Sequence, residues 1–295
     1  MTLAASAPPT RVLGAALWML GAIGSFSTMA VAGRELGPIL DTFEIMMYRS
    51  FFGVIIVVAL AFGSGTWREI KTDALGLHFI RNIAHFAGQN LWFYAVTVIP
   101  MAQLFALEFT SPLWVIVLAP FILGERMTRV RVTAAVMGFI GILIVARPDM
   151  DGINSGMIAA ASCAVFFALV AMFTKRLTRS QSITCILFYL TVMQLVFGII
   201  CAGYDGDIAL PGWSNMPLLV LIGICGLVAH FCITKALTIA PATVVVPIDF
   251  ARLPIIAIVA MLFYGEALDI WVFVGAVIIF AGNYFNIWHE TRKTA

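Results

Sequence analysis

Charge is scarce in this sequence: only 11% of its 295 residues are Asp, Glu, Lys or Arg, whereas 62% are hydrophobic. Soluble domains carry about 25% charged residues and roughly 45–50% apolar ones, so this chain has too little charge to cover a water-facing surface. The shortage excludes a soluble enzyme, a nucleic-acid-binding protein and a disordered chain. The net charge of +2 is too small to indicate a polyanionic partner.

Motifs for nucleotide, hydrolytic and metal chemistry are also missing. The sequence contains no G-x-x-x-x-G-K-[ST] loop, no H-E-x-x-H and no G-x-S-x-G, so it offers neither nucleotide hydrolysis by that route nor those two hydrolytic sites. Its five cysteines lie in apolar stretches without a C-x-x-C pair, which favours buried core residues over disulfides or a metal centre. We therefore expect no metal and no cofactor.

Long apolar runs are what the sequence does have. A membrane-spanning helix needs about 20 mostly apolar residues, and the alternating pattern of a membrane barrel is absent. The first run is too long for a signal-peptide core, so we count it as a span. The sequence predicts an all-α integral membrane protein with ten transmembrane helices at about 12–32, 42–62, 75–98, 101–122, 130–146, 155–174, 182–203, 215–238, 242–263 and 268–288.

The distribution of Lys and Arg between these segments predicts the orientation. On one side the connections carry only Arg34 and Arg147, whereas most other basic residues fall in the tails and connections of the opposite side. Because cytoplasmic loops are enriched in Lys and Arg, we expect both termini in the cytoplasm.

The two halves of the chain resemble each other at an offset of 141 residues. The offset aligns Pro100 with Pro241, Glu108 with Asp249, and the Gly-Glu pair at 124–125 with that at 265–266. It divides the chain into five-helix repeats at 12–146 and 155–288, with short tails at 1–11 and 289–295. Because five is odd, the repeats must insert with opposite topology, as in many secondary transporters whose site lies between the halves.

These features resemble the drug/metabolite transporter superfamily, specifically its EamA-type ten-span transporters. The resemblance rests on two spans that begin with Pro and end in Gly-Glu, PMAQLFALEFTSPLWVIVLAPFILGE at 100–125 and PATVVVPIDFARLPIIAIVAMLFYGE at 241–266. It implies a ten-helix carrier with a central cavity, which moves small organic metabolites by alternating access. Members of the family include both importers and exporters, so the direction of transport stays open.

Charged residues within the spans are the candidates for a binding site, because a charge at the bilayer centre costs at least about 2.5–3.5 kcal/mol on insertion scales. Glu108 and Asp249 each lie about eight residues from opposite ends of their spans, roughly 12 Å deep, so the two carboxylates are expected to flank one central site. Glu44 lies near the start of its span and is expected to reach the interface. The charged residues within the predicted spans are Glu44, Arg49, Arg81, Glu108, Lys235, Asp249 and Arg252.

Several interpretations of these charges stay open. Asp249 and Arg252 are spaced i, i+3 and either neutralise each other or bind solute and protons. Glu108 has no cation one turn away on its own helix and is the stronger functional candidate. Arg49, Arg81 or Arg252 would pair either with a substrate carboxylate or with the protein's own acids. Arg81 alternatively extends to the interface.

Neutral polar and aromatic residues complete the candidate site. Gln89 is a further polar candidate, and His85 and His230 are either proton-coupling residues, with an ordinary pKa near 6.5, or hydrogen-bonded structural residues. Trp92 and Phe109 flank Glu108 and would either line an organic-solute cavity or pack in the core. Pro112, Pro247 and Pro254 are expected to kink or hinge their helices; the pairs Gly138-x-x-Gly141 and Gly223-x-x-Gly226 predict close helix packing.

Together these observations predict a secondary active transporter in a bacterial inner membrane. Its solute would be a small organic metabolite, amino-acid-like or carboxylate-bearing, with proton coupling or exchange as the energy source. The candidate proton-coupling residues are Glu108, Asp249, His85 and His230. The alternatives are a membrane enzyme that acts on a lipid-linked substrate and a passive facilitator. We expect no nucleic-acid partner and either a monomer or a homodimer.

Overall fold

The computed structural model describes residues 9–123, 129–146, 153–204, 206–239, 248–249 and 251–293, and these residues contain no β-strand. The helices are α1 (Pro9–Leu36), α2 (Thr42–Gly63), the 3-10 helix η1 (Thr66–Glu69), α3 (Leu75–Val98), α4 (Met101–Glu108), α5 (Ser111–Leu123), α6 (Arg129–Ala146), α7 (Ser155–Leu177), α8 (Ile183–Ala202), α9 (Met216–Ile239), α11 (Arg252–Tyr264) and α12 (Ile270–Lys293).

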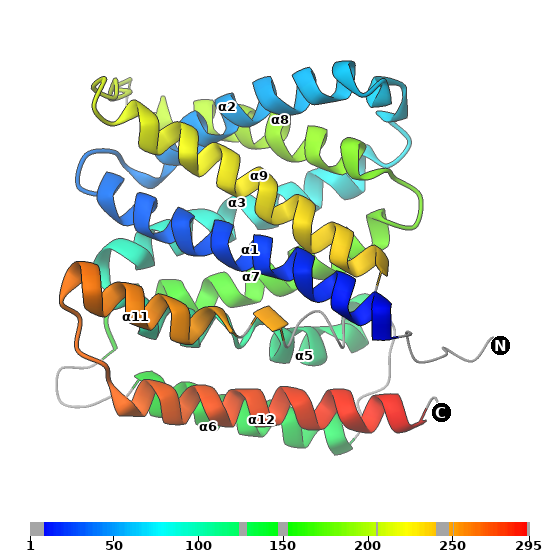
Figure 1. Cartoon of the computed structure of the whole chain (residues 1–295), viewed down its shortest axis with the longest axis vertical. Coiled ribbons are helices and arrows are strands. Elements are labelled where there is room, and N and C mark those ends of the chain that lie inside the picture. The colour runs from blue at the N-terminus through cyan, green and yellow to red at the C-terminus, as the bar shows by residue number, and fades with distance from the viewer. Residues whose placement is uncertain are drawn as a thin grey trace.

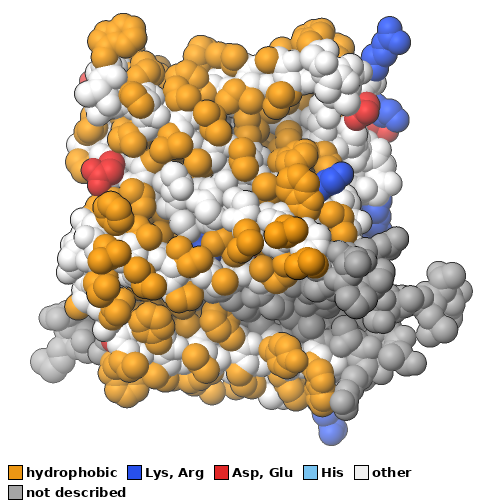
Figure 2. All heavy atoms as spheres, viewed as in Figure 1, with side chains coloured by type: hydrophobic (Ala, Val, Ile, Leu, Met, Phe, Trp, Pro, Cys, Tyr) orange, Lys and Arg blue, Asp and Glu red, His pale blue; other side chains and the backbone are white. Residues whose placement is uncertain are grey.

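The apolar character of these helices confirms the all-α membrane class. Among the described residues, five helices are long and apolar enough to cross a membrane, and shorter apolar helices cover Val132–Val145, Arg252–Tyr264 and Ile270–Gly282. On the face in Figure 2, hydrophobic side chains predominate, and most of the visible Lys and Arg lie toward the edge where α1 begins and α12 ends. Such a surface suits lipid contact.

One predicted span is broken rather than continuous. The segment expected at 101–122 consists of α4 and α5, which are separated at Phe109 and Thr110. Pro112 has no backbone N–H and therefore cannot donate to the carbonyl of Glu108, four residues earlier. The break accordingly falls beside the intramembrane carboxylate of Glu108.

Corresponding helices of the two halves keep a constant spacing. α3 and α9, like α5 and α11, begin and end 141 residues apart, and α2 and α8 begin 141 residues apart. The most extensive packing pairs α1 with α9, α3 with α7, α2 with α8, and α6 with α12. Figure 1 shows α2 and α8 at one end of the long axis and α6 and α12 at the other. Each of these pairs joins one helix from the first half to one from the second.

Glu44, which is expected to reach toward the membrane interface, makes specific protein contacts in the first turn of α2. Its side chain is buried and accepts hydrogen bonds from the backbone N–H groups of Asp41 and Ala209. The Asp41 side chain in turn accepts from the Glu44 N–H, which forms a capping box at the start of α2. Glu44 therefore caps α2 and holds the 206–215 connection against it, a contact that a helical pattern in sequence does not reveal.

Glycines bring α6 and α12 into backbone contact. A Cβ atom added at Gly275 would lie 2.7 Å from the carbonyl oxygen of Gly141, and one added at Gly141 would lie 2.8 Å from that of Gly275. Backbone atoms cannot rotate away as a side chain can, so the two helices would have to separate. The close approach predicted from Gly141 is therefore present in the fold.

We expect Gly275→Ala to destabilise the protein by about 1–3 kcal/mol, because the added methyl group overpacks this contact. Gly24→Ala is the matched control, since a Cβ there would meet nothing within 4 Å. The measurement is the temperature at which the detergent-solubilised protein loses its monodisperse size-exclusion peak. Equal temperatures for both variants would contradict the proposed role of the α6–α12 contact.

Candidate functional site

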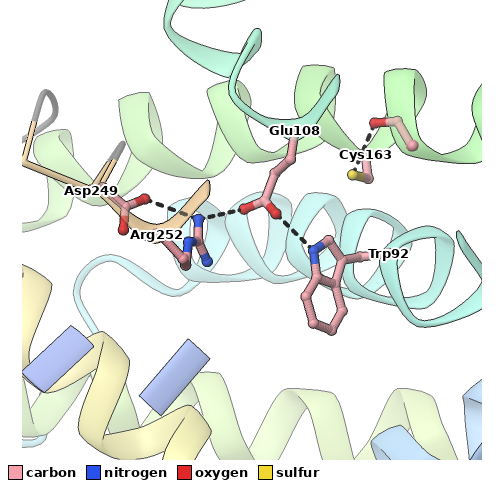
Figure 3. A network of polar contacts seen from close by, with 6 residues as sticks. Trp92, Glu108, Cys163, Asp249 and Arg252 are labelled. Atoms are coloured by element: carbon pink, nitrogen blue, oxygen red, sulfur yellow. Dashed lines mark hydrogen bonds and ion pairs between the residues drawn. The ribbon is translucent and has the colours of Figure 1, made fainter. Parts of the chain in front are cut away.

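Arg252 joins two carboxylates inside the helix bundle. It is the first residue of α11, and its Nη2 atom lies 2.9 Å from Oε1 of Glu108 and 3.0 Å from Oδ2 of Asp249. Figure 3 shows the guanidinium between the two acids. Glu108, the last residue of α4, comes from the other half of the sequence. The offset that predicted a shared site for Glu108 and Asp249 thus relates two acids that bind one arginine.

Trp92 fixes the second oxygen of Glu108. Its indole Nε1, which α3 supplies, donates a hydrogen bond of 2.8 Å to Glu108 Oε2 (Figure 3). Both oxygens of this buried carboxylate are therefore engaged, one by a cation and one by a neutral donor. Two carboxylates share one guanidinium, so the Arg252 cluster, which we define as Trp92, Glu108, Asp249 and Arg252, has a net charge of −1 when both acids are ionised.

Aromatic rings surround the guanidinium of Arg252. Its Cζ atom lies 4.8 Å from the ring centroid of Phe26, 4.9 Å from that of Phe105 and 5.2 Å from that of Phe109. These distances are in the range of cation–π interactions. Two polar atoms of the cluster, Asp249 Oδ1 and Arg252 Nε, have no hydrogen-bond partner among the described residues. The cluster can therefore offer both an acceptor and a donor to a bound molecule.

A second polar group lies among α2, α3, α8 and α9 and is cationic. Nε2 of His85 and Nε2 of His230 are 3.1 Å apart, so one of these nitrogens must carry a proton and the other must accept it. Among the described residues, Arg81 donates to two neutral oxygens, Thr174 Oγ1 at 3.2 Å and Asn82 Oδ1 at 2.8 Å. Neither Arg49 nor Arg81 has a carboxylate within 4.0 Å in the described part of the chain.

Phe26 connects the acidic and basic groups. Its ring packs edge-on against His230 at a centroid distance of 6.0 Å, and it also contacts the Arg252 guanidinium. The ring centroid of His230 and the Cζ atom of Arg252 therefore lie no farther apart than the sum of those two distances. The arrangement places a cluster with excess negative charge next to a group with excess positive charge.

The remaining predicted residues fall at different places. Gln89 is buried, and its Nε2 atom has no partner among the described residues. Pro112 follows the break between α4 and α5, whereas Pro254 is exposed in the first turn of α11. Pro247 lies outside the described residues. Among those that the structure does describe, no group of three or more His, Cys, Asp or Glu could hold a metal ion.

Three residues that contact the candidate site were not predicted: Asn82, which accepts from Arg81, Gln194, which donates to the Asn82 carbonyl, and Phe26. Asn82 and Gln194 are polar residues within apolar spans, so the signal that identified Gln89 was available for them too. Phe26 has no such signal, because an aromatic residue in a spanning helix is ordinary. Its role depends on which residues of α9 and α11 face α1.

Comparison with known proteins assigns the family. Residues 13–147 and 154–288 each match the EamA-like transporter family. The chain therefore belongs to this family, within the drug/metabolite transporter superfamily.

Curated relatives are transporters of small metabolites. The S-adenosylmethionine uptake transporter of Rickettsia felis is 28% identical over 275 residues, 93% of this chain and 92% of that protein. The riboflavin transporter of Vibrio cholerae is 28% identical over 294 residues, with 96% and 95% covered. The pseudopaline exporter of Pseudomonas aeruginosa is 24% identical over 258 residues, with 86% and 89% covered. The chain is thus a small-metabolite transporter and not an enzyme.

A solved crystal structure shares the fold. It covers 96% of this chain and 99% of its own, with a TM-score of 0.66 at 19% sequence identity. This similarity shows the common fold alone.

We expect Arg252→Met to destabilise the protein by about 3–5 kcal/mol, because it leaves the buried carboxylate of Glu108 and the partly buried one of Asp249 without a cation. Trp92→Phe removes one hydrogen bond to a charged group and should cost less, about 1.5–3 kcal/mol. Arg68→Met, at an exposed position in η1, is the control. Thermal unfolding in detergent should rank Arg252→Met as the least stable; equal stability of Arg252→Met and Arg68→Met would contradict the cluster's structural role.

Proposed function

We propose that the chain is a ten-helix secondary transporter in a bacterial inner membrane, with both termini in the cytoplasm. The two five-helix halves, 12–146 and 155–288, are proposed to be inverted repeats that expose a shared site alternately to each side. The constant spacing of corresponding helices and the packing of each half against the other support this arrangement. The basic edge in Figure 2 supports the orientation, because Lys and Arg concentrate on the cytoplasmic side.

The observation that carries the proposed substrate class is the adjacent pair of unbalanced charges. The Arg252 cluster has one carboxylate more than its single guanidinium neutralises, and aromatic rings surround it. The nearby His85–His230 pair belongs to the same polar group as Arg49 and Arg81. Neither arginine forms an ion pair with an acidic side chain among the described residues. A solute with both a cationic centre and a carboxylate complements both groups at once.

This charge pattern discriminates between solutes of the relatives. S-adenosylmethionine has a sulfonium cation and an amino-acid head with a carboxylate, whereas riboflavin is uncharged near neutral pH. The sulfonium would bind beside the acids and aromatic rings, where cation–π attraction adds to the electrostatic attraction. We therefore propose a solute that resembles S-adenosylmethionine in having a cationic centre and a carboxylate, rather than a flavin.

Protons and the solute's cation would compete for the same excess negative charge. When Glu108 or Asp249 binds a proton, the Arg252 cluster becomes neutral and its attraction for a cationic group falls. Such competition couples the two gradients as an exchange. Its direction depends on which gradient is larger.

Counterflow in proteoliposomes tests the transporter proposal. Vesicles are preloaded with unlabelled S-adenosylmethionine, methionine or riboflavin, and entry of the matching trace label is followed with and without a pH gradient. We expect accelerated entry of labelled S-adenosylmethionine and no acceleration for riboflavin. Accelerated entry of riboflavin alone would reject the charge argument, and an absence of counterflow for all three would reject the proposed substrate class.

We further predict that Glu108→Gln abolishes the response of counterflow to a pH gradient, because the cluster then lacks the carboxylate that exceeds its one cation. Membrane insertion should be unchanged, since Gln keeps the size of the side chain. Glu69→Gln, the same substitution at an exposed residue of η1, should behave as wild type. Wild-type flux and pH dependence in Glu108→Gln would show that Glu108 does not bind the coupled proton.

A further inference from the structure

Arg49 lines a narrow pocket between α2, α3, α8 and α9. Arg49 is 7% exposed, and among the described residues its guanidinium donates one hydrogen bond, from Nη1 to the Met46 sulfur at 3.4 Å. A thioether is a weak acceptor, so the guanidinium has donors to spare. The pocket lining includes Arg49, His85, Gln194, Gly223 and Gly226.

Glycine at 226 provides the space that the Arg49 guanidinium occupies. A Cβ atom at Gly226 would lie 2.5 Å from Nη2, 2.6 Å from Nε and 2.9 Å from Cζ of Arg49. Gly223, one turn earlier, lets α9 approach α2, since a Cβ there would lie 3.2 Å from the Arg49 carbonyl oxygen. The Gly223-x-x-Gly226 pair therefore packs the helices and also accommodates the buried charge.

Two further polar side chains of the pocket lining are only weakly partnered. They are His85, 1% exposed, and Gln194, 2% exposed; they interact with each other, yet neither His85 Nδ1 nor Gln194 Oε1 makes a hydrogen bond of normal geometry among the described residues. The Gln194 amide is oriented by a 2.8 Å hydrogen bond from its Nε2 atom to the Asn82 carbonyl, which leaves Oε1 as an acceptor. Buried polar groups with unused hydrogen-bonding capacity cost free energy. Three such groups line this one pocket: the Arg49 guanidinium, the His85 ring and the Gln194 amide.

We propose that Arg49, Gln194 and His85 form a subsite for a carboxylate of the transported solute. The guanidinium presents the paired donors that a carboxylate accepts, and Gln194 Oε1 would accept a hydrogen bond from an adjacent N–H group, as an amino-acid head supplies. His85 contacts His230, which packs on Phe26 beside Arg252. These successive contacts connect the subsite to the Arg252 cluster, and its assignment to the solute rests on the transporter function proposed above.

Direct binding of acetate to the purified full-length protein tests the subsite without transport. Acetate replaces chloride at constant ionic strength while the unfolding temperature is followed in detergent. We expect a saturable rise for the wild type, none for Arg49→Gln, and none when acetamide, the neutral analogue, is added instead. An equal rise in Arg49→Gln, or no rise in the wild type, would overturn the proposal; so would saturation by chloride alone, which would indicate a site for inorganic anions.

Two more variants separate binding from folding. Arg49→Lys keeps the charge without the paired donors and should raise the half-saturating acetate concentration about ten-fold or more. Gly226→Ala displaces the guanidinium and should weaken acetate binding while the charge is retained, whereas Gly24→Ala should leave it unchanged. Wild-type acetate affinity in both Arg49→Lys and Gly226→Ala would overturn the assignment.

The two proposals can fail separately. Arg49-dependent acetate binding without counterflow of any tested solute would uphold the subsite and reject the proposed transport. Counterflow of S-adenosylmethionine without Arg49-dependent acetate binding would uphold transport and reject the subsite.

Discussion

The interior of this protein is organised by one arginine that two carboxylates share. Charges within a bilayer are tolerated only where partners replace the lost water, and Arg252 supplies that partner to Glu108 and Asp249 at 2.9 Å and 3.0 Å. Through Glu108 and its hydrogen bond to Trp92, the same interaction ties α11 to α4 and α3. The break between α4 and α5 lies beside it, so an interruption of the helical backbone lies next to the buried carboxylate of Glu108.

Ion pairs neutralise some of the buried charges in the interior and leave others without a counter-charge. The Arg252 cluster is short of one positive charge, and the group around His85 and His230 is short of negative charge among the described residues. Phe26 contacts both, so the two deficits are neighbours and do not lie at opposite ends of the bundle. A fold that needed these charges only for stability would lower its free energy by pairing them with each other; their separation therefore favours a role in binding.

Sequence alone predicted the class of fold, and the repeat offset related the two acids of the site. Hydropathy located α3 at its observed bounds, and the alignment of Glu108 with Asp249 anticipated that both would lie near one place. It did not select Arg252 as their common partner, reveal the capping role of Glu44, or identify Phe26. Those contacts depend on how each helix is rotated and tilted against its neighbours. An apolar sequence constrains that geometry weakly, because lipid-facing and core-facing residues have the same character.

At position 226, the absence of a side chain serves both helix packing and the burial of a charged group. Small residues let helices approach, yet at this position the missing side chain is replaced by the guanidinium of Arg49 and not by a neighbouring backbone. The cation is thus held in place without a carboxylate partner among the described residues, and in the proposed subsite the carboxylate of the solute would supply the missing counter-charge. A zwitterion would relieve this deficit and that of the Arg252 cluster together, whereas a simple anion or cation relieves only one. Since specificity is a difference between affinities, the separation of the two deficits can discriminate a zwitterionic metabolite from singly charged competitors.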